Sequence, residues 1–206
     1  MKIGEYINKN FDHFYVRNLK QAPKRLEHFK KNIETINLKY EVFHGINGND
    51  WVPNNFPHNK YLTGNALSFI NIIFDAMKNN YKSFVCCDDD TIFYDYEIDE
   101  KEQNELIPND WDIINLGNIK MKNNPSKIKF INIKNQPSLI EGSQCCAFNN
   151  KGYFILLKEL FKFEQKGLVG DGLYDQLSKN DKINLYKLNP DFCYQEREVL
   201  KPYTIE

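Results

Sequence analysis

The sequence predicts an α/β domain, spanning residues 1–206 as a single unit, with a mainly parallel central sheet flanked by helices. Short β-rich runs alternate along the chain with segments in which apolar residues recur every three or four positions, as in βα units. One run, residues 83–87, is apolar almost throughout, which is typical of a central parallel strand covered on both faces. A chain of 206 residues can also bury a core without disulfides or a structural metal.

The individual elements follow from local patterns. Pro23 suits the first turn of a helix, Thr63 can cap a second one that runs to about Asn80, and Gly172 precedes a last short helix. A further helix is expected over 152–163. Strands are expected where apolar and β-branched residues cluster, over 13–16, 40–43, 83–87, 111–116, 144–148, 183–188 and, as an edge strand, 129–134. Residues 51–60 and 118–128 are rich in Asn, Pro or Lys, which predicts irregular loops.

Composition narrows the class of protein. Lys and Arg number 27 against 28 Asp and Glu, a net charge of −1, so no global positive field favours nucleic acid as a partner. No apolar run approaches the roughly 18 residues of a membrane helix, and the first ten residues lack the apolar core of a signal peptide. We therefore expect a cytoplasmic protein with no transmembrane segment. The five cysteines include two adjacent pairs and no metal-binding spacing, which predicts reduced, buried thiols.

The strongest chemical signal is the triplet Asp88-Asp89-Asp90, directly after the apolar strand. Ligands of open α/β sheets bind beyond the carboxyl ends of the strands. Neighbouring carboxylates repel one another, and a divalent cation such as Mn²⁺ or Mg²⁺ relieves that repulsion. Because residues i and i+2 of an extended segment face the same side, Asp88 and Asp90 are expected to share the metal. The alternative is a solvated acidic turn.

Several segments together resemble glycosyltransferase family 25, the lipopolysaccharide and collagen-type glycosyltransferases. The matching pieces occur in the family's order over about residues 13–197. They are the strand ending at Asn18-Leu19 with Arg25 after it, the segment 42–48 that ends in Gly48, the stretch 62–69, the acidic triplet, the strand 110–117, the piece 146–152, Asp171 and Gln195. The chain departs from the family's pattern at three places, where Asn65 replaces Cys, Phe69 replaces His and Asp88 replaces Glu.

The resemblance implies a GT-A fold and transfer of a sugar from a nucleotide-sugar donor, a UDP-sugar by analogy, to a hydroxyl of a glycan, a lipid-linked acceptor or a protein. It implies that Asp88 and Asp90 hold the metal. The donor would be bound by Arg17, Asn18, Arg25, Gly45, Asn47, Asp89 and Gln195.

The resemblance also implies inversion at the anomeric carbon, which requires a base to deprotonate the acceptor hydroxyl. Asp171, between two glycines and ahead of a helix, is the candidate base, and Asp175 is the reserve. Asp171 can equally be a plain helix cap.

Two other functions remain open. A phosphatase of the haloacid-dehalogenase type would use Asp88 as nucleophile together with Asp90, and residues 170–175 resemble the late acidic loop of that family. An inactive nucleotide-sugar-binding module would keep the acidic cluster and lack a base. Hydrolysis of a phosphomonoester or of a UDP-sugar discriminates between the two enzymes.

Overall fold

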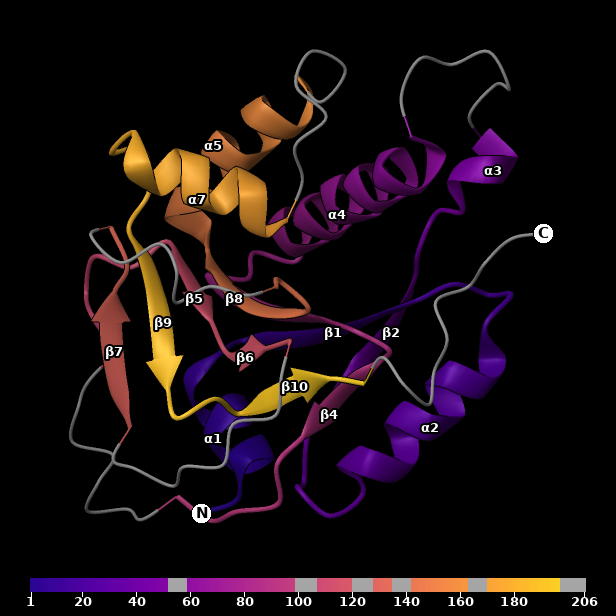
Figure 1. Cartoon of the computed structure of the whole chain (residues 1–206), viewed down its shortest axis with the longest axis vertical. Helices are drawn as coiled ribbons and strands as arrows, with labels where there is room; N and C mark the ends of the chain where they lie inside the picture. Colours follow the sequence, from indigo (N-terminus) through magenta and orange to yellow (C-terminus); the bar gives the residue numbers. More distant parts are fainter. Residues whose placement is uncertain (52–58, 99–106, 120–127, 135–141, 163–169, 197–206) are drawn as a thin grey trace.

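The computed structural model describes residues 1–51, 59–98, 107–119, 128–134, 142–162 and 170–196. Its centre is a seven-stranded sheet in the order β2-β1-β3-β8-β5-β9-β7, with helices on both faces (Figure 1). The strands of this sheet are β1 His13–Asn18, β2 Glu41–His44, β3 Ser83–Asp88, β5 Ile113–Asn115, β7 Lys129–Asn132, β8 Cys145–Asn149 and β9 Leu185–Asn189. The helices are α1 Ile3–Asn10, α2 Pro23–Ile33, α3 Gly48–Trp51, α4 Lys60–Lys78, α5 Asn150–Leu160 and α7 Asp171–Lys179.

The α/β class is confirmed, but the prediction of a mainly parallel sheet is wrong because the sheet is mixed. β1 is parallel to β2 and β3, and β5 is parallel to β9. β8 is antiparallel to both of its neighbours, β3 and β5, and β7 is antiparallel to β9. Parallel neighbours need a crossover between them, usually a helix. The described residues between β5 and β8 contain no helix, and β8 enters the sheet in the opposite direction.

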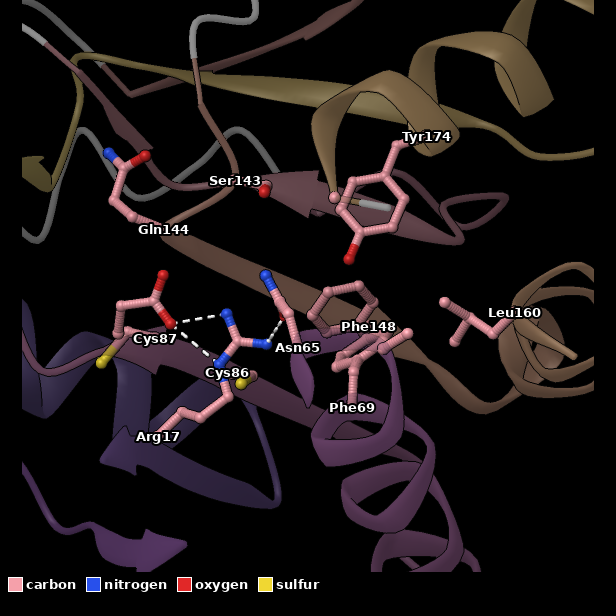
Figure 2. A pocket seen from close by; sticks show the side chains of 13 residues that line it. Arg17, Asn65, Phe69, Cys86, Cys87, Ser143, Gln144, Phe148, Leu160 and Tyr174 are labelled. Atoms are coloured by element: carbon pink, nitrogen blue, oxygen red, sulfur yellow. Dashed lines mark hydrogen bonds and ion pairs between the residues drawn. The ribbon is translucent and has the colours of Figure 1, made fainter. Parts of the chain in front are cut away.

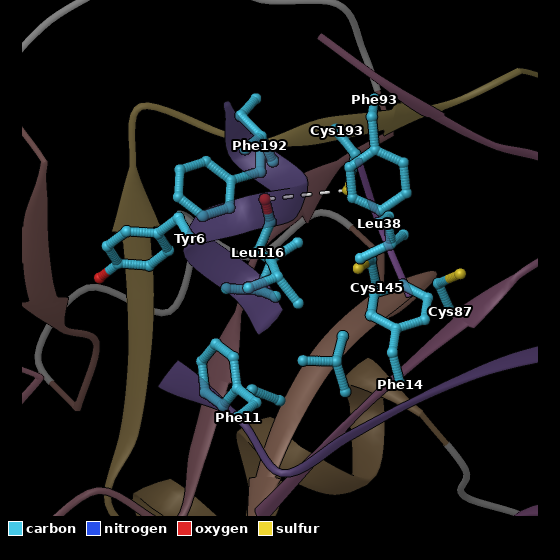
Figure 3. Close-up of a cluster of buried hydrophobic side chains, with 14 of the residues drawn as sticks. Tyr6, Phe11, Phe14, Leu38, Cys87, Phe93, Leu116, Cys145, Phe192 and Cys193 are labelled. Carbon is cyan, nitrogen blue, oxygen red and sulfur yellow. Dashed lines mark hydrogen bonds between the residues drawn. The ribbon is translucent and has the colours of Figure 1, made fainter. Parts of the chain in front are cut away.

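Two hydrophobic cores lie on opposite faces of the sheet because successive side chains of a strand alternate in direction. In β3, Val85 and Cys87 belong to the core beneath α1 and α2, whereas Phe84 and Cys86 belong to the core beneath α4, α5 and α7. Figure 3 shows the first of these cores, which Tyr6 of α1 enters among several aromatic rings. The prediction that this strand is covered on both faces is therefore confirmed.

A smaller sheet packs on the α1 and α2 side. It consists of β4 Thr91–Phe93, β10 Cys193–Gln195 and β6 Gly117–Asn118, with β10 in the middle. β10 is antiparallel to β4, and Gln195 is the register partner of Thr91. This pairing carries Gln195 to the residue that follows the acidic triplet.

Most predicted elements form near their expected positions, including β7 at the edge of the sheet. Helix α4 begins at Lys60 and not at Thr63, because the Asn59 side chain caps it by accepting hydrogen bonds from the backbone N–H groups of Tyr61 and Leu62 at 2.8 and 3.4 Å. The predicted loops at 51–60 and 118–128 lie largely outside the described residues.

Helix α1 was not predicted. Its buried side chains, Ile3, Tyr6 and Ile7, follow the spacing of one helix face, but they are diluted by polar neighbours. In the described part of the chain, no helix combines the length and the apolar character needed to cross a bilayer.

Candidate functional site

The carboxyl ends of β1, β2 and β3 open onto a cleft of about 580 Å³. Because these strands are parallel, the residues that end them meet at one edge of the sheet. Nine residues were expected to bind a donor or a metal, and all nine line this cleft: Arg17, Asn18, Arg25, Gly45, Asn47, Asp88, Asp89, Asp90 and Gln195. The structure thus brings together side chains from positions 17 to 195 of the chain.

Two arginines contact the three carboxylates. Arg17 donates to Oδ1 of Asp88 from Nε at 2.9 Å and from Nη2 at 2.6 Å. Nη2 of Arg25 lies 2.5 Å from Oδ1 of Asp89 and 2.9 Å from Oδ2 of Asp90. Charge repulsion within the triplet, which the sequence suggested a metal would relieve, is therefore opposed in part by two guanidinium groups. Three carboxylates against two guanidiniums still leave an excess of negative charge in the cleft.

Two amides complete the cluster. Nδ2 of Asn18 donates to Oδ2 of Asp89 at 2.6 Å and to the carbonyl oxygen of Ala22 at 3.0 Å. Nε2 of Gln195 donates to Oδ2 of Asp90 at 3.1 Å. Asn18 therefore ties the triplet to the turn between β1 and α2, and Gln195 ties it to the small sheet.

Burial is the largest single influence on the pKa values of Asp89, Asp90 and Arg17. It raises the pKa of Asp90 to about 6, helped by the charge of Asp88 and opposed by that of Arg25. Burial also raises the pKa of Asp89, against the influence of Arg25. For Arg17, burial favours the neutral form, but the charge of Asp88 together with Cys86, Tyr174 and the hydrogen bond to Asp88 raises the pKa. Asp90 is thus a buried carboxyl for which a further cation would be favourable.

A glycine-containing segment, residues 45–48, also lines the cleft. The N–H of Gly45 donates to the carbonyl oxygen of Asn18 at 2.9 Å, and the N–H of Ile46 donates to Oγ of Ser68 at 2.7 Å. Gly48 lies against α4 so closely that a Cβ there would be 1.8 Å from the carbonyl oxygen of Lys60. These contacts therefore fix residues 45–48, from the end of β2 to the start of α3, against α4.

Helix α4 adds cleft residues to which the sequence assigned no function. Tyr61, Asn65 and Ser68 all line the cleft, and their spacing of four and three residues places them on one face of the helix. Asn65 accepts a hydrogen bond from Nη1 of Arg17. The sequence spacing could have predicted that these three residues share one helix face. The contact between Asn65 and Arg17 depends on how β1 and α4 pack, so the sequence alone could not predict it.

A second, smaller pocket of about 20 Å³ adjoins the cleft and shares Arg17, Asn65 and Asp88 with it. We call it the inner pocket. Figure 2 shows Arg17 and Asn65 on one side of it, Ser143 and Tyr174 on the other, and aromatic rings nearby. Its volume suits about one water molecule or one hydroxyl group.

The two candidate bases do not line the cleft. Oδ2 of Asp171 accepts a hydrogen bond from the N–H of Gly142 at 3.1 Å, and its chain neighbour Gly170 lines the inner pocket. Oδ2 of Asp175 pairs with Nζ of Lys179 at 2.6 Å, one turn along α7. Asp171 is therefore next to the inner pocket, and Asp175 is engaged on the helix surface.

A divalent cation fits the cluster only through a few protein ligands. Among the described residues, no three His, Cys, Asp or Glu side chains are placed to bind one ion. Oδ1 of Asp90, however, is buried and has no hydrogen-bond partner. Mg²⁺ usually binds through one or two carboxylates and completes its coordination with substrate phosphates and water. Asp90 suits such a site, and Asp88 lies beside it in the same cleft.

Comparisons with known proteins assign no family. No protein-family model and no curated protein matches the chain. Among solved structures, the chain is similar to A197 from STIV, with a TM-score of 0.40 and 14% identity over 87% of this chain and 81% of that one. It is also similar to a glycosyltransferase involved in the glycosylation of the major capsid of PBCV-1, with a TM-score of 0.39 and 8% identity over 75% of this chain and 66% of that one. Both scores are too low to carry an argument about this chain.

Proposed function

We propose that this protein is a metal-dependent glycosyltransferase of the GT-A type, which moves a sugar from a nucleotide-sugar donor to a hydroxyl acceptor with inversion. One observation carries the proposal. Two arginines, two side-chain amides and three carboxylates converge in one cleft at the carboxyl ends of parallel strands. The cleft volume of about 580 Å³ lies within the range of small-molecule and cofactor sites.

The donor would be held by both charge and backbone groups. Arg17 and Arg25 can give charge-assisted hydrogen bonds to the diphosphate, exchanging part of their contact with the carboxylates for contact with phosphate oxygens. Asn18, Gly45 and Asn47 line the same cleft and would border the ribose and the base. UDP is the nucleotide that the resemblance to family 25 favours.

Asp90 would be the main protein ligand of Mn²⁺ or Mg²⁺, with Asp88 assisting. Gln195 and Arg25 both contact Oδ2 of Asp90, which fixes the carboxylate and leaves Oδ1 for the ion. A cation there, when bound, would stabilise the negative charge that develops on the departing diphosphate.

Asp171 would be the base that accepts the proton of the acceptor hydroxyl. It adjoins the inner pocket, whereas the donor cleft lies on the other side of Arg17 and Asn65. An acceptor hydroxyl beside Asp171 would then attack the anomeric carbon on the face opposite the departing diphosphate, as inversion requires, and its proton would pass to Asp171. The acceptor would be a glycan, a lipid-linked hydroxyl or a protein hydroxyl.

The phosphatase alternative has less support. It needs Asp171 or Asp175 close to Asp88 and Asp90 around one metal. Asp171 contacts Gly142, Asp175 contacts Lys179, and neither lines the cleft. The inactive binding module would use the same cleft, so activity alone separates it from a transferase.

The direct test incubates the protein with Mn²⁺ and UDP-glucose, UDP-galactose or GDP-mannose, with water as the acceptor of the sugar, and measures release of the nucleoside diphosphate by hydrolysis. We expect release with one of these donors, and its loss in Asp90→Asn and Asp171→Asn. Binding of the donor without release would indicate the inactive module. Release of phosphate from p-nitrophenyl phosphate would favour the phosphatase.

A further inference from the structure

A buried ion pair is connected to the candidate base through a series of hydrogen bonds. Lys187 of β9 is 5% exposed, and its ammonium group pairs with the carboxylate of Asp191, which is 9% exposed. Burying both charges costs desolvation free energy, so such a pair is a poor device for stability alone. The hydrogen bonds from the pair to neighbouring groups are therefore more informative about its role than the ion pair alone.

Lys187 begins a continuous series of hydrogen bonds. Its Nζ donates to Oδ1 of Asn115 at 2.7 Å and also to the carbonyl oxygen of Gly117. Nδ2 of Asn115 donates to the carbonyl oxygen of Gly142 at 2.7 Å. The N–H of Gly142 in turn donates to Oδ2 of Asp171 at 3.1 Å. The series thus runs from a buried ammonium group to the carboxylate of Asp171.

Gly142, the link between Asn115 and Asp171, has a backbone conformation that residues other than glycine rarely adopt. Its φ of +89° lies in the left-handed region, and a Cβ there would be 2.5 Å from Oε1 of Gln144. The bond from Asn115 holds the carbonyl of Gly142, and the N–H group that faces Asp171 lies on the other side of the same Cα, so the two bonds together hold Gly142 between Asn115 and Asp171. The other oxygen of Asp171, Oδ1, accepts the N–H of Gly172 at 3.1 Å. Backbone donors therefore orient both oxygens, and each keeps capacity for a further bond.

We infer that Lys187, acting through Asn115 and Gly142, is a positioning residue for the carboxylate of Asp171. The inference rests on the proposed function, in which Asp171 is the base. Misplacing a reacting group by about 1 Å can lower a rate about 100-fold. Lys187, Asn115 and Gly142 are buried and hydrogen-bonded to one another in series, which limits such movement more than a surface loop would.

Two variants interrupt the series at different points. Asn115→Ala removes the central link and leaves the ion pair intact. The double variant Lys187→Met with Asp191→Asn removes both charges together, so no buried charge is left without a partner. Asp12→Asn is the matched control, because Oδ2 of Asp12 accepts backbone N–H groups of Lys82 and Ser83 at 2.7 and 3.1 Å at the opposite end of β3.

The first measurement is hydrogen exchange of the Gly142 amide by NMR, which requires no substrate. We expect exchange at Gly142 to rise at least about tenfold in both variants and to stay unchanged in the control. The second measurement is nucleoside diphosphate release from the active donor with Mn²⁺. We expect kcat to fall about 10- to 100-fold with KM for the donor within about twofold. In an Asp171→Asn background, neither variant should lower the residual rate of release further.

The outcomes separate the two proposals. Unchanged exchange at Gly142, or equal losses of kcat with and without the Asp171 carboxylate, would overturn the positioning role while leaving the transferase intact. If the wild-type protein consumes none of the three donors, the proposed function is wrong, and the catalytic consequence drawn for Lys187 is wrong with it. Raised exchange at Gly142 would then support only the control of Asp171 geometry.

Discussion

Arg17 and Asp88 are register partners on the parallel strands β1 and β3, and their side chains form an ion pair at the edge of the sheet. Both bonds from Arg17 reach the same oxygen, Oδ1 of Asp88, at 2.9 and 2.6 Å. The third nitrogen of Arg17 donates to Asn65 of α4. One guanidinium group thus joins two strands and a helix between the cleft and the inner pocket.

Replacing Arg17 by Met should destabilise the fold and weaken donor binding. The side chains of Arg17 and Asp88 are 18% and 27% exposed, so solvent screens the pair only partly. We expect the free energy of unfolding to fall by about 1–3 kcal/mol, measured by urea denaturation. Lys24→Ala, an exposed change on α2, should alter it by less than about 0.5 kcal/mol. Equal stability of the two variants would contradict the role of the pair.

Asp90 should make stability depend on pH. Because its pKa is raised from 3.8 to about 6, the folded state binds more protons than the unfolded state between these values. The free energy of unfolding contributed by this group therefore falls as pH rises from about 4 to about 6 and is lowest above that range. The difference between wild type and Asp90→Asn should shift by about 1–3 kcal/mol across this window in urea titrations without metal. A difference that does not vary with pH would be inconsistent with the burial of this carboxyl.

The contact between Gly48 and α4 should not tolerate a side chain. A Cβ at Gly48 would meet the carbonyl oxygen of Lys60 at 1.8 Å, so the loop would have to move. We expect Gly48→Ala to lower the free energy of unfolding by about 2–4 kcal/mol and to weaken donor binding.

The matched control is Gly152→Ala in α5. A Cβ there would lie 3.5 Å from Cβ of Asp112, an ordinary contact, and Ala is the better helix former. This variant should gain about 0.5–1 kcal/mol. If both alanine variants were equally stable, the close approach of the loop to α4 would be wrong.

The cysteines should be unreactive in the folded protein. All five are free and buried, and burial raises the pKa of Cys86 and Cys87 to about 12. The thiolate is the reactive form, so 5,5′-dithiobis(2-nitrobenzoic acid) at pH 8 should label the native protein very slowly and all five thiols after unfolding in urea. Rapid labelling of any thiol in the native protein would show that a core strand is accessible.

The sequence located much of the cleft for a simple physical reason. Asn18 and Asp88 end neighbouring apolar strands, and parallel strands deliver their last residues to one edge of a sheet. Gln195 lies on β10 of the small sheet, and only the resemblance to family 25 grouped it with these residues. The expected roles of these residues remain predictions.

Other features could not be read from the sequence. An apolar run looks the same whether its strand is parallel or antiparallel to its neighbours. The sequence therefore did not predict that β8 lies antiparallel between β3 and β5. Charge patterns suggested that the acidic triplet needed a metal, because the partners Arg17 and Arg25 become visible only when the strands and α2 are packed. The sequence assigned no role to Lys187, and its burial is explained only by its contacts with Asn115 and Asp191.

The most direct test of the account is calorimetric titration of UDP-glucose, UDP-galactose and GDP-mannose into the wild-type protein and into Asp90→Asn, each with Mn²⁺ and with EDTA. The account predicts that one donor binds the wild type at least about tenfold more tightly with Mn²⁺, and that this gain disappears in Asp90→Asn. Equal affinities in Mn²⁺ and EDTA, or a gain that survives in Asp90→Asn, would contradict it.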